Sequence, residues 1–394
     1  MSGAPQPGEE PMLPFGFGDL DLNQLMRMLQ AGGPVNWEIA TQVARHVATD
    51  GEPERPDDPA AATQMEELAR AAQTHVVAET GLSATFAARV QTTGRTGWVD
   101  LHLEALKPVL EALATTLGRA LAGSADEPGG PAGTDPFSAM MPMLAPLLLG
   151  VQAGSMIGYL AQHALGRYDL PLPTADRPSL CFVIPNVDGF EEAWSLERAD
   201  LRFTIALHEV VHAAARSVPW VRERLVSLAT DYVSAYEVDP VILRARLGDV
   251  DPANPEALQS LAERPEELLG AMTSPRQEEM LARLRVFHSV LDGYGDEILA
   301  RIGARLVPSF ARIHEAVTRH RLERGEASRF VEQLLGLTME REDYERGAAF
   351  CAGVVERAGA DALNRLWEDP SMIPTASELE APGLWLARIE LDLP

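Results

Sequence analysis

Two histidines and a glutamate with a spacing suited to metal chemistry lie near the middle of the chain, in the pattern His208-Glu209-Val210-Val211-His212. Histidines four residues apart lie on one face of a helix, so both imidazoles can reach a single zinc ion. Glu209 would then be held beside the metal, where it can take a proton from metal-bound water. The pattern predicts a zinc-dependent hydrolase that cleaves peptide or other amide bonds, with Glu209 as the general base.

The surroundings of this pattern favour a buried helix. The neighbouring residues 205–207, 210–211 and 213–214 are all uncharged, whereas an exposed helix would place charges among them. Histidine is also scarce, with nine in the chain, so the pattern rarely arises by chance from this composition. The alternative interpretation is structural, with both imidazoles bonded to core carbonyl groups and Glu209 at a helix edge.

A catalytic zinc usually has three protein ligands, so the third must be sought elsewhere. Metzincins place Gly and His three and six residues after the second histidine, but Ala215 and Val218 stand there. A thermolysin-like arrangement expects a glutamate on the following helix. Asp231 and Glu237 lie in that neighbourhood, around Tyr232, but we interpret both as exposed helix acids.

A more distant segment offers a better third ligand. One face of the helix predicted there carries Leu284, His288, Leu291, Asp292 and Gly295. A carboxylate on an apolar face is costly unless it is paired or bound to metal. We therefore predict Asp292 as the third zinc ligand and His288 as a spare ligand or a group that orients one.

Two further positions in this segment bear on the same site. Gly293 and Gly295 each cost the helix roughly 1 kcal/mol relative to alanine, which predicts close approach of another backbone, such as that of the motif helix. Tyr294 is a candidate oxyanion donor, and Asp296 is another possible ligand. The alternative for the whole segment is a salt-bridged contact between helices.

Composition limits the partners. The chain has 394 residues, is 46% hydrophobic and carries a formal net charge of −25, which disfavours nucleic acid and anionic membranes as partners. The two cysteines, Cys181 and Cys351, lie in apolar runs and fit free thiols of a reducing compartment. Residues 1–14 lack the features of a signal peptide, so we expect a cytoplasmic protein.

Most of the chain has helical periodicity, so the expected fold is mainly α with a small β element next to the motif helix. Leu180–Ile184 is the best strand candidate, either as a guide for an extended substrate or as a buried strand. The motif helix is expected to begin near Ser195 and to end before Pro219. The other helices are expected at 20–29, 37–47, 62–79, 99–121, 221–236, 256–269, 276–306, 308–322, 327–335 and 341–367.

Residues 137–165 contain no charge, which raises the possibility of a membrane span. Internal prolines and glutamines and the lack of flanking basic clusters favour a buried helix instead. Gly150, Gly154 and Gly158 recur every four residues and would give that helix one smooth face for close packing.

Several segments resemble a family of bacterial zincin-like metallopeptidases, sometimes associated with biosynthesis of a deazaflavin coenzyme. The resemblance covers roughly residues 137–390 and rests on PLLLGVQAGSMIGYLAQHALGRYDLPLP, FVIPNVDGFEEAW, LHEVVHAAARSVPW, SVLDGYGDEIL, LLGLTMEREDYERGAAFC and ALNRLWEDPSMIPTASEL. It implies a mainly helical fold and supports His208 and His212 as zinc ligands and Glu209 as general base.

In that family the position of Asp292 is usually Glu and that of Tyr294 often His. Asp292 is one methylene shorter, so the helices must lie closer or a water must bridge. No glycine-rich phosphate loop follows a strand, so the sequence indicates no deazaflavin or nucleotide site.

Composition, helical periodicity and the resemblance together predict four regions. They are a disordered tail at 1–14, an N-terminal helical region at 15–122, a flexible acidic loop at 123–135, and a zincin-like metallopeptidase domain at 136–394. The rival hypothesis is a non-catalytic, zinc-stabilised interaction protein, with a fourth ligand from His288 or Asp296.

Overall fold

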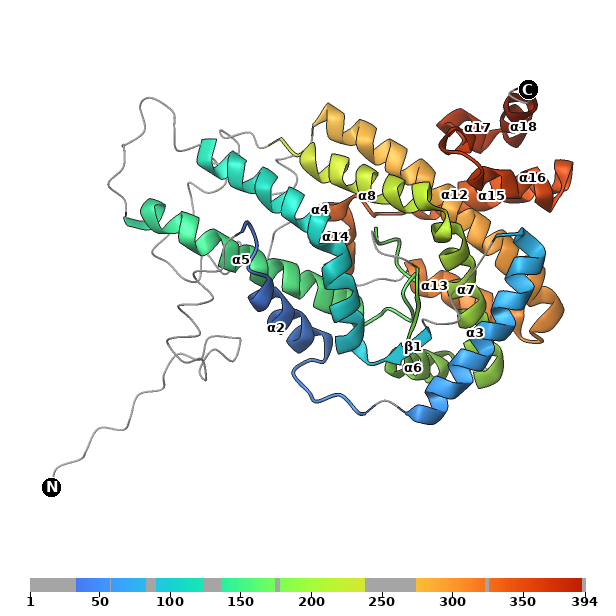
Figure 1. The fold of residues 1–394 in the computed structure, drawn as a ribbon, viewed down its shortest axis with the longest axis horizontal. Coiled ribbons are helices and arrows are strands. Elements are labelled where there is room, and N and C mark those ends of the chain that lie inside the picture. The colour runs from blue at the N-terminus through green and yellow to red at the C-terminus, as the bar shows by residue number, and fades with distance from the viewer. Residues whose placement is uncertain are drawn as a thin grey trace.

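The computed structural model describes residues 33–56, 58–82, 90–123, 136–173, 178–237, 274–322 and 326–391. The predicted tail, the predicted helix at 20–29, most of the acidic loop and the predicted helix at 256–269 lie outside these ranges. Within them the fold is mainly α, as predicted, with one two-stranded sheet (Figure 1). The main helices are α2 (Trp37–Ala48), α3 (Pro59–Thr80), α4 (Arg95–Gly123), α5 (Pro136–Ala161), α6 (Ile184–Trp194), α7 (Arg198–Ser217), α8 (Pro219–Ser234), α12 (Pro275–Leu306), α13 (Phe310–Leu322), α14 (Glu326–Leu335) and α15 (Arg341–Ala358). The predicted helix at 341–367 is divided into α15, α16 (Ala360–Asn364) and the 3-10 turn η2 (Arg365–Trp367), and α17 (Ala376–Glu380) and α18 (Pro382–Leu391) follow.

Local signals explain where several helices begin. Asp58 caps α3 by accepting the N–H of Ala60 at 2.9 Å, and proline follows as the first helical residue. Ser274 caps α12 in the same way, accepting the N–H of Gln277 at 3.2 Å before Pro275. These caps satisfy N–H groups that have no partner inside the first turn of a helix.

The glycine stripe of α5 packs against α2, which confirms the predicted smooth face. A Cβ at Gly150 or Gly154 would lie 2.5 Å from a backbone carbonyl oxygen, of Asn36 and Ala40 respectively. At Gly158 it would lie 2.6 Å from Cβ of Val47. Figure 1 shows α2 and α5 side by side. Among the described residues, no helix combines the length and apolar character that a membrane crossing requires.

The sheet consists of two parallel strands, β1 (Val90–Thr93) and β2 (Leu180–Val183). β2 matches the predicted strand, whereas β1 was not predicted. The other edge of β2 is also occupied, because the N–H of Arg167 donates to Cys181 O at 3.2 Å and the N–H of Val183 donates to Leu165 O at 3.0 Å. With both edges bonded and all four residues buried, β2 has no edge for a substrate strand. The interpretation of this strand as a substrate guide is therefore wrong, and the buried-strand interpretation holds.

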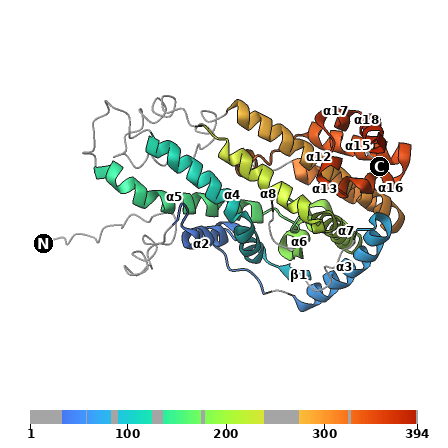
Figure 2. The same cartoon turned by 45° about the horizontal axis from the view of Figure 1, so that its top comes forward.

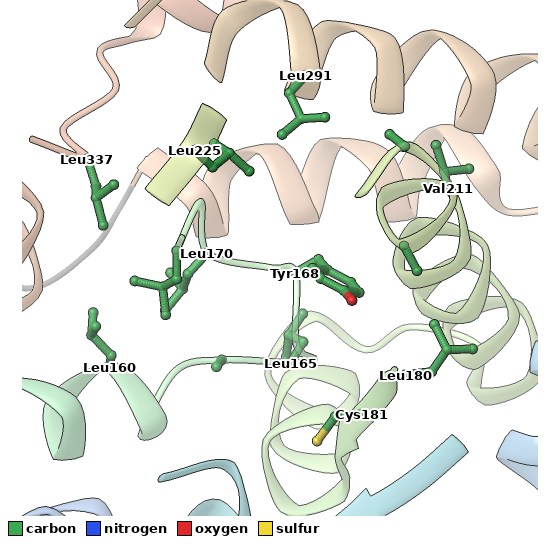
Figure 3. Close-up of a cluster of buried hydrophobic side chains, with 14 of the residues drawn as sticks. Leu160, Leu165, Tyr168, Leu170, Leu180, Cys181, Val211, Leu225, Leu291 and Leu337 are labelled. Atoms are coloured by element: carbon green, nitrogen blue, oxygen red, sulfur yellow. The ribbon is translucent and has the colours of Figure 1, made fainter. Parts of the chain in front are cut away.

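One hydrophobic cluster, from Val35 to Ile389, joins the N-terminal helices to the motif helix. α7 packs against α3, α8 and α12. Figure 2 shows α7 among these helices, whereas α2, α4 and α5 lie toward the other end of the molecule. Part of the cluster surrounds residues 165–170, where Tyr168 lies on an irregular segment with its ring turned toward the helix that carries Val211 (Figure 3). The N-terminal helices thus share a core with the predicted metal-binding helix.

Candidate active site

α7 begins at Arg198, two residues later than a helix capped by Ser195 would begin. Ser195 instead closes α6 in the left-handed conformation, with φ 50°, and its N–H donates to the carbonyls of Glu191 and Glu192. Glu197 is the residue that caps α7, accepting the N–H of Asp200 at 2.9 Å. The prediction of Ser195 as the N-cap is therefore wrong, because the preceding helix uses this serine to turn the chain. The helix ends at Ser217, before Pro219, as predicted.

His208 and His212 project from the same face of α7. Their ring centroids are 4.4 Å apart, and the planes are inclined by 49°. His212 is 1% exposed, whereas His208 is 9% exposed and borders a pocket. The helix thus brings both imidazoles together, as the four-residue spacing requires.

Glu209 is fully buried and held by two backbone groups. Its Oε2 accepts the N–H of Arg167 at 2.8 Å and its Oε1 accepts the N–H of Tyr168 at 2.9 Å. We call this pair of bonds the carboxylate clamp. Nδ1 of His208 lies 3.6 Å from Oε1, on the same side of the helix. Because each carboxylate oxygen has further lone pairs, the clamp fixes the group and still leaves acceptor capacity.

Residue 166 must be small for the clamp to form. A Cβ at Gly166 would lie 2.5 Å from Oε1 of Glu209. The carbonyl of Gly166 accepts the indole N–H of Trp98, on α4, at 2.9 Å. Through this bond α4 positions the segment at 166–168, whose backbone N–H groups bind Glu209.

His212 lies between an arginine and the backbone of α12. Its Nδ1 is 2.9 Å from Nη1 of Arg216, and a Cβ at Gly295 would lie 2.6 Å from its Nε2. Nε2 is buried and has no hydrogen-bond partner among the residues described. Burial, followed by the positive charge of neighbouring His208, Arg216 and Arg321, lowers the pKa of His212 well below its usual value.

α12 presents the predicted acids to this region. Burial raises the pKa of Asp292, while the positive charges of Arg321, Arg216 and His208 act in the opposite direction. Nη1 of Arg321, on α13, lies 3.1 and 3.2 Å from the two carboxylate oxygens of Asp296. Asp292 thus interacts electrostatically with His208, Arg216 and Arg321, and Asp296 pairs with Arg321, whose side chain is 9% exposed.

His288 lies farther along the same face of α12. It is 1% exposed, and neither ring nitrogen has a hydrogen-bond partner in the described part of the chain. Burial, with a smaller contribution from the charge of Arg216, lowers the pKa of His288 to about 3. This residue is therefore a neutral imidazole beside Arg216.

The two glycines of α12 approach different neighbours. A Cβ at Gly293 would lie 2.3 Å from the backbone of Gly347 on α15, whereas Gly295 faces His212. Close approach was predicted for both, and the motif helix is the neighbour at Gly295 only.

Tyr294 points away from the histidines. It precedes Gly295 by one residue and is turned about 100° around the helix. Its hydroxyl donates to Oδ1 of Asn364 at 2.8 Å, and its ring packs on Trp367. The structure therefore does not bring the predicted oxyanion donor to the site. Asp231 and Glu237 are exposed on or just after α8, which agrees with their interpretation as surface acids.

A pocket opens beside His208 and Glu209. α13 supplies one wall through His314, Val317, Thr318 and Arg321. The remainder is lined by residues of three other segments, Leu165, Gly166, Asp169, Thr204, Ile205, Asp296 and Leu299. This wall was not predicted, because α13 has no motif and lies about a hundred residues beyond the histidines.

The donor types at this site fit zinc. Two imidazoles and a carboxylate are usual zinc ligands, and the buried Nε2 of His212 lacks a hydrogen-bond partner within the described ranges. Within the described residues, however, no three His, Cys, Asp or Glu side chains are grouped so that they could hold a metal ion, so Asp292 does not join the two histidines there as the predicted third ligand. Sequence reasoning also missed Arg216, although its position one turn after His212 was a usable signal.

Comparison with known proteins gives a consistent result. The model of a family described as zincin-like metallopeptidase matches residues 35–386. The chain is also similar to a solved structure described as a putative hydrolase with a novel fold from Chloroflexus aurantiacus. The two share 25% sequence identity with a TM-score of 0.62, over 91% of this chain and 100% of the other. A search of curated proteins gave no match.

Proposed function

Because the chain belongs to the zincin-like metallopeptidase family, we propose that it is a zinc-dependent hydrolase that cleaves peptide or other amide bonds. The observation that supports this most directly is the position of His208 and Glu209, which both line a pocket while His212 lies beside them. A pocket is the kind of site in which a substrate carbonyl can reach a metal and a general base.

His208 and His212 would hold the metal, and Asp292 would have to move toward them to become the third ligand. When bound, zinc would lower the pKa of its water and polarise the scissile carbonyl. Glu209 would take the proton from that water and return it to the leaving amine. The carboxylate clamp supports this role, because it keeps Glu209 in one position beside His208 without using a cation.

The pocket wall on α13 would contact the substrate. Val317, Ile205 and Leu299 offer apolar surface, and Arg321 offers hydrogen-bond donors. The hydroxyl of Thr318 already donates to the carbonyl of His314 at 2.9 Å, so it offers an acceptor. An amide with an apolar group next to the scissile bond suits this combination.

The decisive experiment combines metal analysis with Glu209→Gln. Near one zinc per chain after dialysis, by elemental mass spectrometry, is the expected result for both the natural protein and the variant. Hydrolysis of a peptide library should be lost in the variant and kept in Glu223→Gln, which changes an exposed acid of α8. Absence of zinc after incubation with excess metal, or hydrolysis retained by Glu209→Gln, would contradict the proposal.

A second candidate is a non-hydrolytic, zinc-stabilised interaction protein. The complete burial of Glu209 favours it, since water and substrate must reach a general base but need not reach a structural glutamate. The two functions differ in whether water binds the metal. Replacement of zinc by cobalt distinguishes the two functions through water exchange on the bound ion. Exchange requires an open coordination position, which a hydrolase has and a closed structural site lacks.

A further inference from the structure

A buried arginine continues the row of histidines on α7. His208, His212 and Arg216 stand four residues apart, so they share one face of the helix. α12 lies against this face, and its Gly295 is opposite the middle member of the row. A guanidinium group therefore stands next to one of the two predicted zinc ligands.

The contacts of Arg216 are few for a buried cation. The side chain is 1% exposed, and its Nη1 donates to Nδ1 of His212 at 2.9 Å. The guanidinium carbon lies 4.9 Å from the centre of the Tyr168 ring. Nε and Nη2 have no hydrogen-bond partner in the described ranges. The one close polar side chain bonded to this arginine is thus a predicted zinc ligand.

This contact fixes the tautomer of His212. A guanidinium has five N–H donors and no acceptor, so Nδ1 must offer its lone pair. In a neutral imidazole the hydrogen is then on Nε2, the nitrogen that faces Gly295. A histidine that binds zinc through Nε2 has the opposite arrangement, with its Nδ1–H donating to a carboxylate, carbonyl or water.

We propose that Arg216 is a positioning residue that holds His212 in a tautomer unable to bind metal through Nε2, so that metal binding requires the guanidinium to leave Nδ1. This inference rests on the proposed function, because it concerns the same zinc site. The charge distribution agrees with it, since Asp292 and Glu209 both interact favourably with the Arg216 cation. A metal held by the histidines would compete with Arg216 for the same acidic groups.

Replacement of Arg216 tests the competition. Arg216→Gln offers a carbonyl oxygen that can accept Nδ1–H, so Zn²⁺ should bind at least about 10-fold tighter than in the natural protein. Arg216→Lys keeps a cationic donor, and its affinity should stay close to the natural value. Affinity is measured by competition with a chromophoric chelator. The control is Arg202→Gln, which changes another buried arginine of α7 that pairs with Asp188, away from the histidines.

The outcomes separate this inference from the proposed function. If neither the natural protein nor Arg216→Gln binds zinc, the zinc hydrolase itself is wrong, and this inference falls with it. Equal or weaker binding by Arg216→Gln, with zinc still bound by the natural protein, overturns the role of Arg216 alone.

A second measurement needs no variant. Nitrogen-15 NMR of the histidine rings in the metal-free natural protein reports which nitrogen carries hydrogen. We expect His212 to carry it on Nε2, and to carry it on Nδ1 once zinc is added. A metal-free spectrum with hydrogen on Nδ1 of His212 would overturn the inference, whatever the stability of the variants.

Discussion

Gly295 lies directly against His212: a Cβ at position 295 would lie 2.6 Å from Nε2 of the imidazole. α12 and α7 therefore meet where a helix has no side chain. This close approach brings Asp292, one turn earlier on α12, into the electrostatic environment of the histidines.

Gly295→Ala should disrupt this contact. Either the imidazole or α12 must shift, so we expect about 10-fold or greater loss of zinc affinity and a loss of about 1–3 kcal/mol in unfolding free energy. Zinc titration and urea unfolding measure the two effects. Gly189→Ala in α6 is the control, because nothing lies within 4 Å of its Cβ. Unchanged zinc affinity in Gly295→Ala would show that His212 does not bind metal at this point.

The carboxylate clamp predicts a stability effect separate from catalysis. In Glu209→Gln one clamp oxygen is replaced by an amide NH₂, which meets the N–H donor of Arg167 or Tyr168. The lost bond should lower the unfolding free energy by about 1–3 kcal/mol. Amide hydrogen exchange should also be faster at Arg167 or Tyr168. Glu223→Gln should stay within about 0.5 kcal/mol of the natural protein; an equal effect in both variants would exclude the clamp as the cause.

The α2–α5 contact predicts a cost for a single methyl group. Gly154→Ala would place a Cβ 2.5 Å from the carbonyl oxygen of Ala40, where only backbone movement can relieve the overlap. We expect a loss of about 1–3 kcal/mol in urea unfolding. Gly383→Ala in α18 has open space around its Cβ and should be close to neutral. A neutral Gly154→Ala would mean that the two helices pack less closely than described.

His288 predicts a pH-dependent stability. Burial lowers its pKa to about 3, whereas the unfolded residue titrates near its usual value of about 6.5. Between these values the unfolded chain binds one more proton, so the unfolding free energy should fall as pH decreases, by up to about 1.4 kcal/mol per pH unit. His288→Leu should remove this part of the slope in urea unfolding between pH 7 and 5. His163→Asn, at an exposed histidine, is the control, and an identical slope in His288→Leu and the natural protein would contradict the assignment.

Local sequence signals predicted much of the fold. The 3.6-residue periodicity located α2, α3 and α12 to within a few residues, because each buries one regular face. The glycine spacing in α5 predicted a packing face, although the partner helix could not be identified from it. β1 escaped prediction because four residues with mixed exposure form a strand only through pairing with β2.

The candidate site was predictable where its residues share one helix. His208, Glu209 and His212 follow from spacing alone, whereas the clamp depends on backbone N–H groups, which leave no mark in side-chain identity. Tyr294 shows the limit of motif reasoning, because one residue along a helix turns a side chain by about 100°. Arg321 reaches the pocket through tertiary packing of α13, which no local pattern reveals.

The pairing of β1 with β2 also fixes the order in which this protein can assemble during synthesis. Gln91 and Cys181 are 90 residues apart in sequence, and β2 in turn holds residues 165–167. The motif helix can form from local contacts alone, but closing so long a loop slows the pairing that completes its surroundings. A ribosome must therefore release both the strand at 90–93 and the helix at 198–217 before Glu209 acquires its final position. Under the proposed function, zinc capture would follow this pairing of the two halves of the chain.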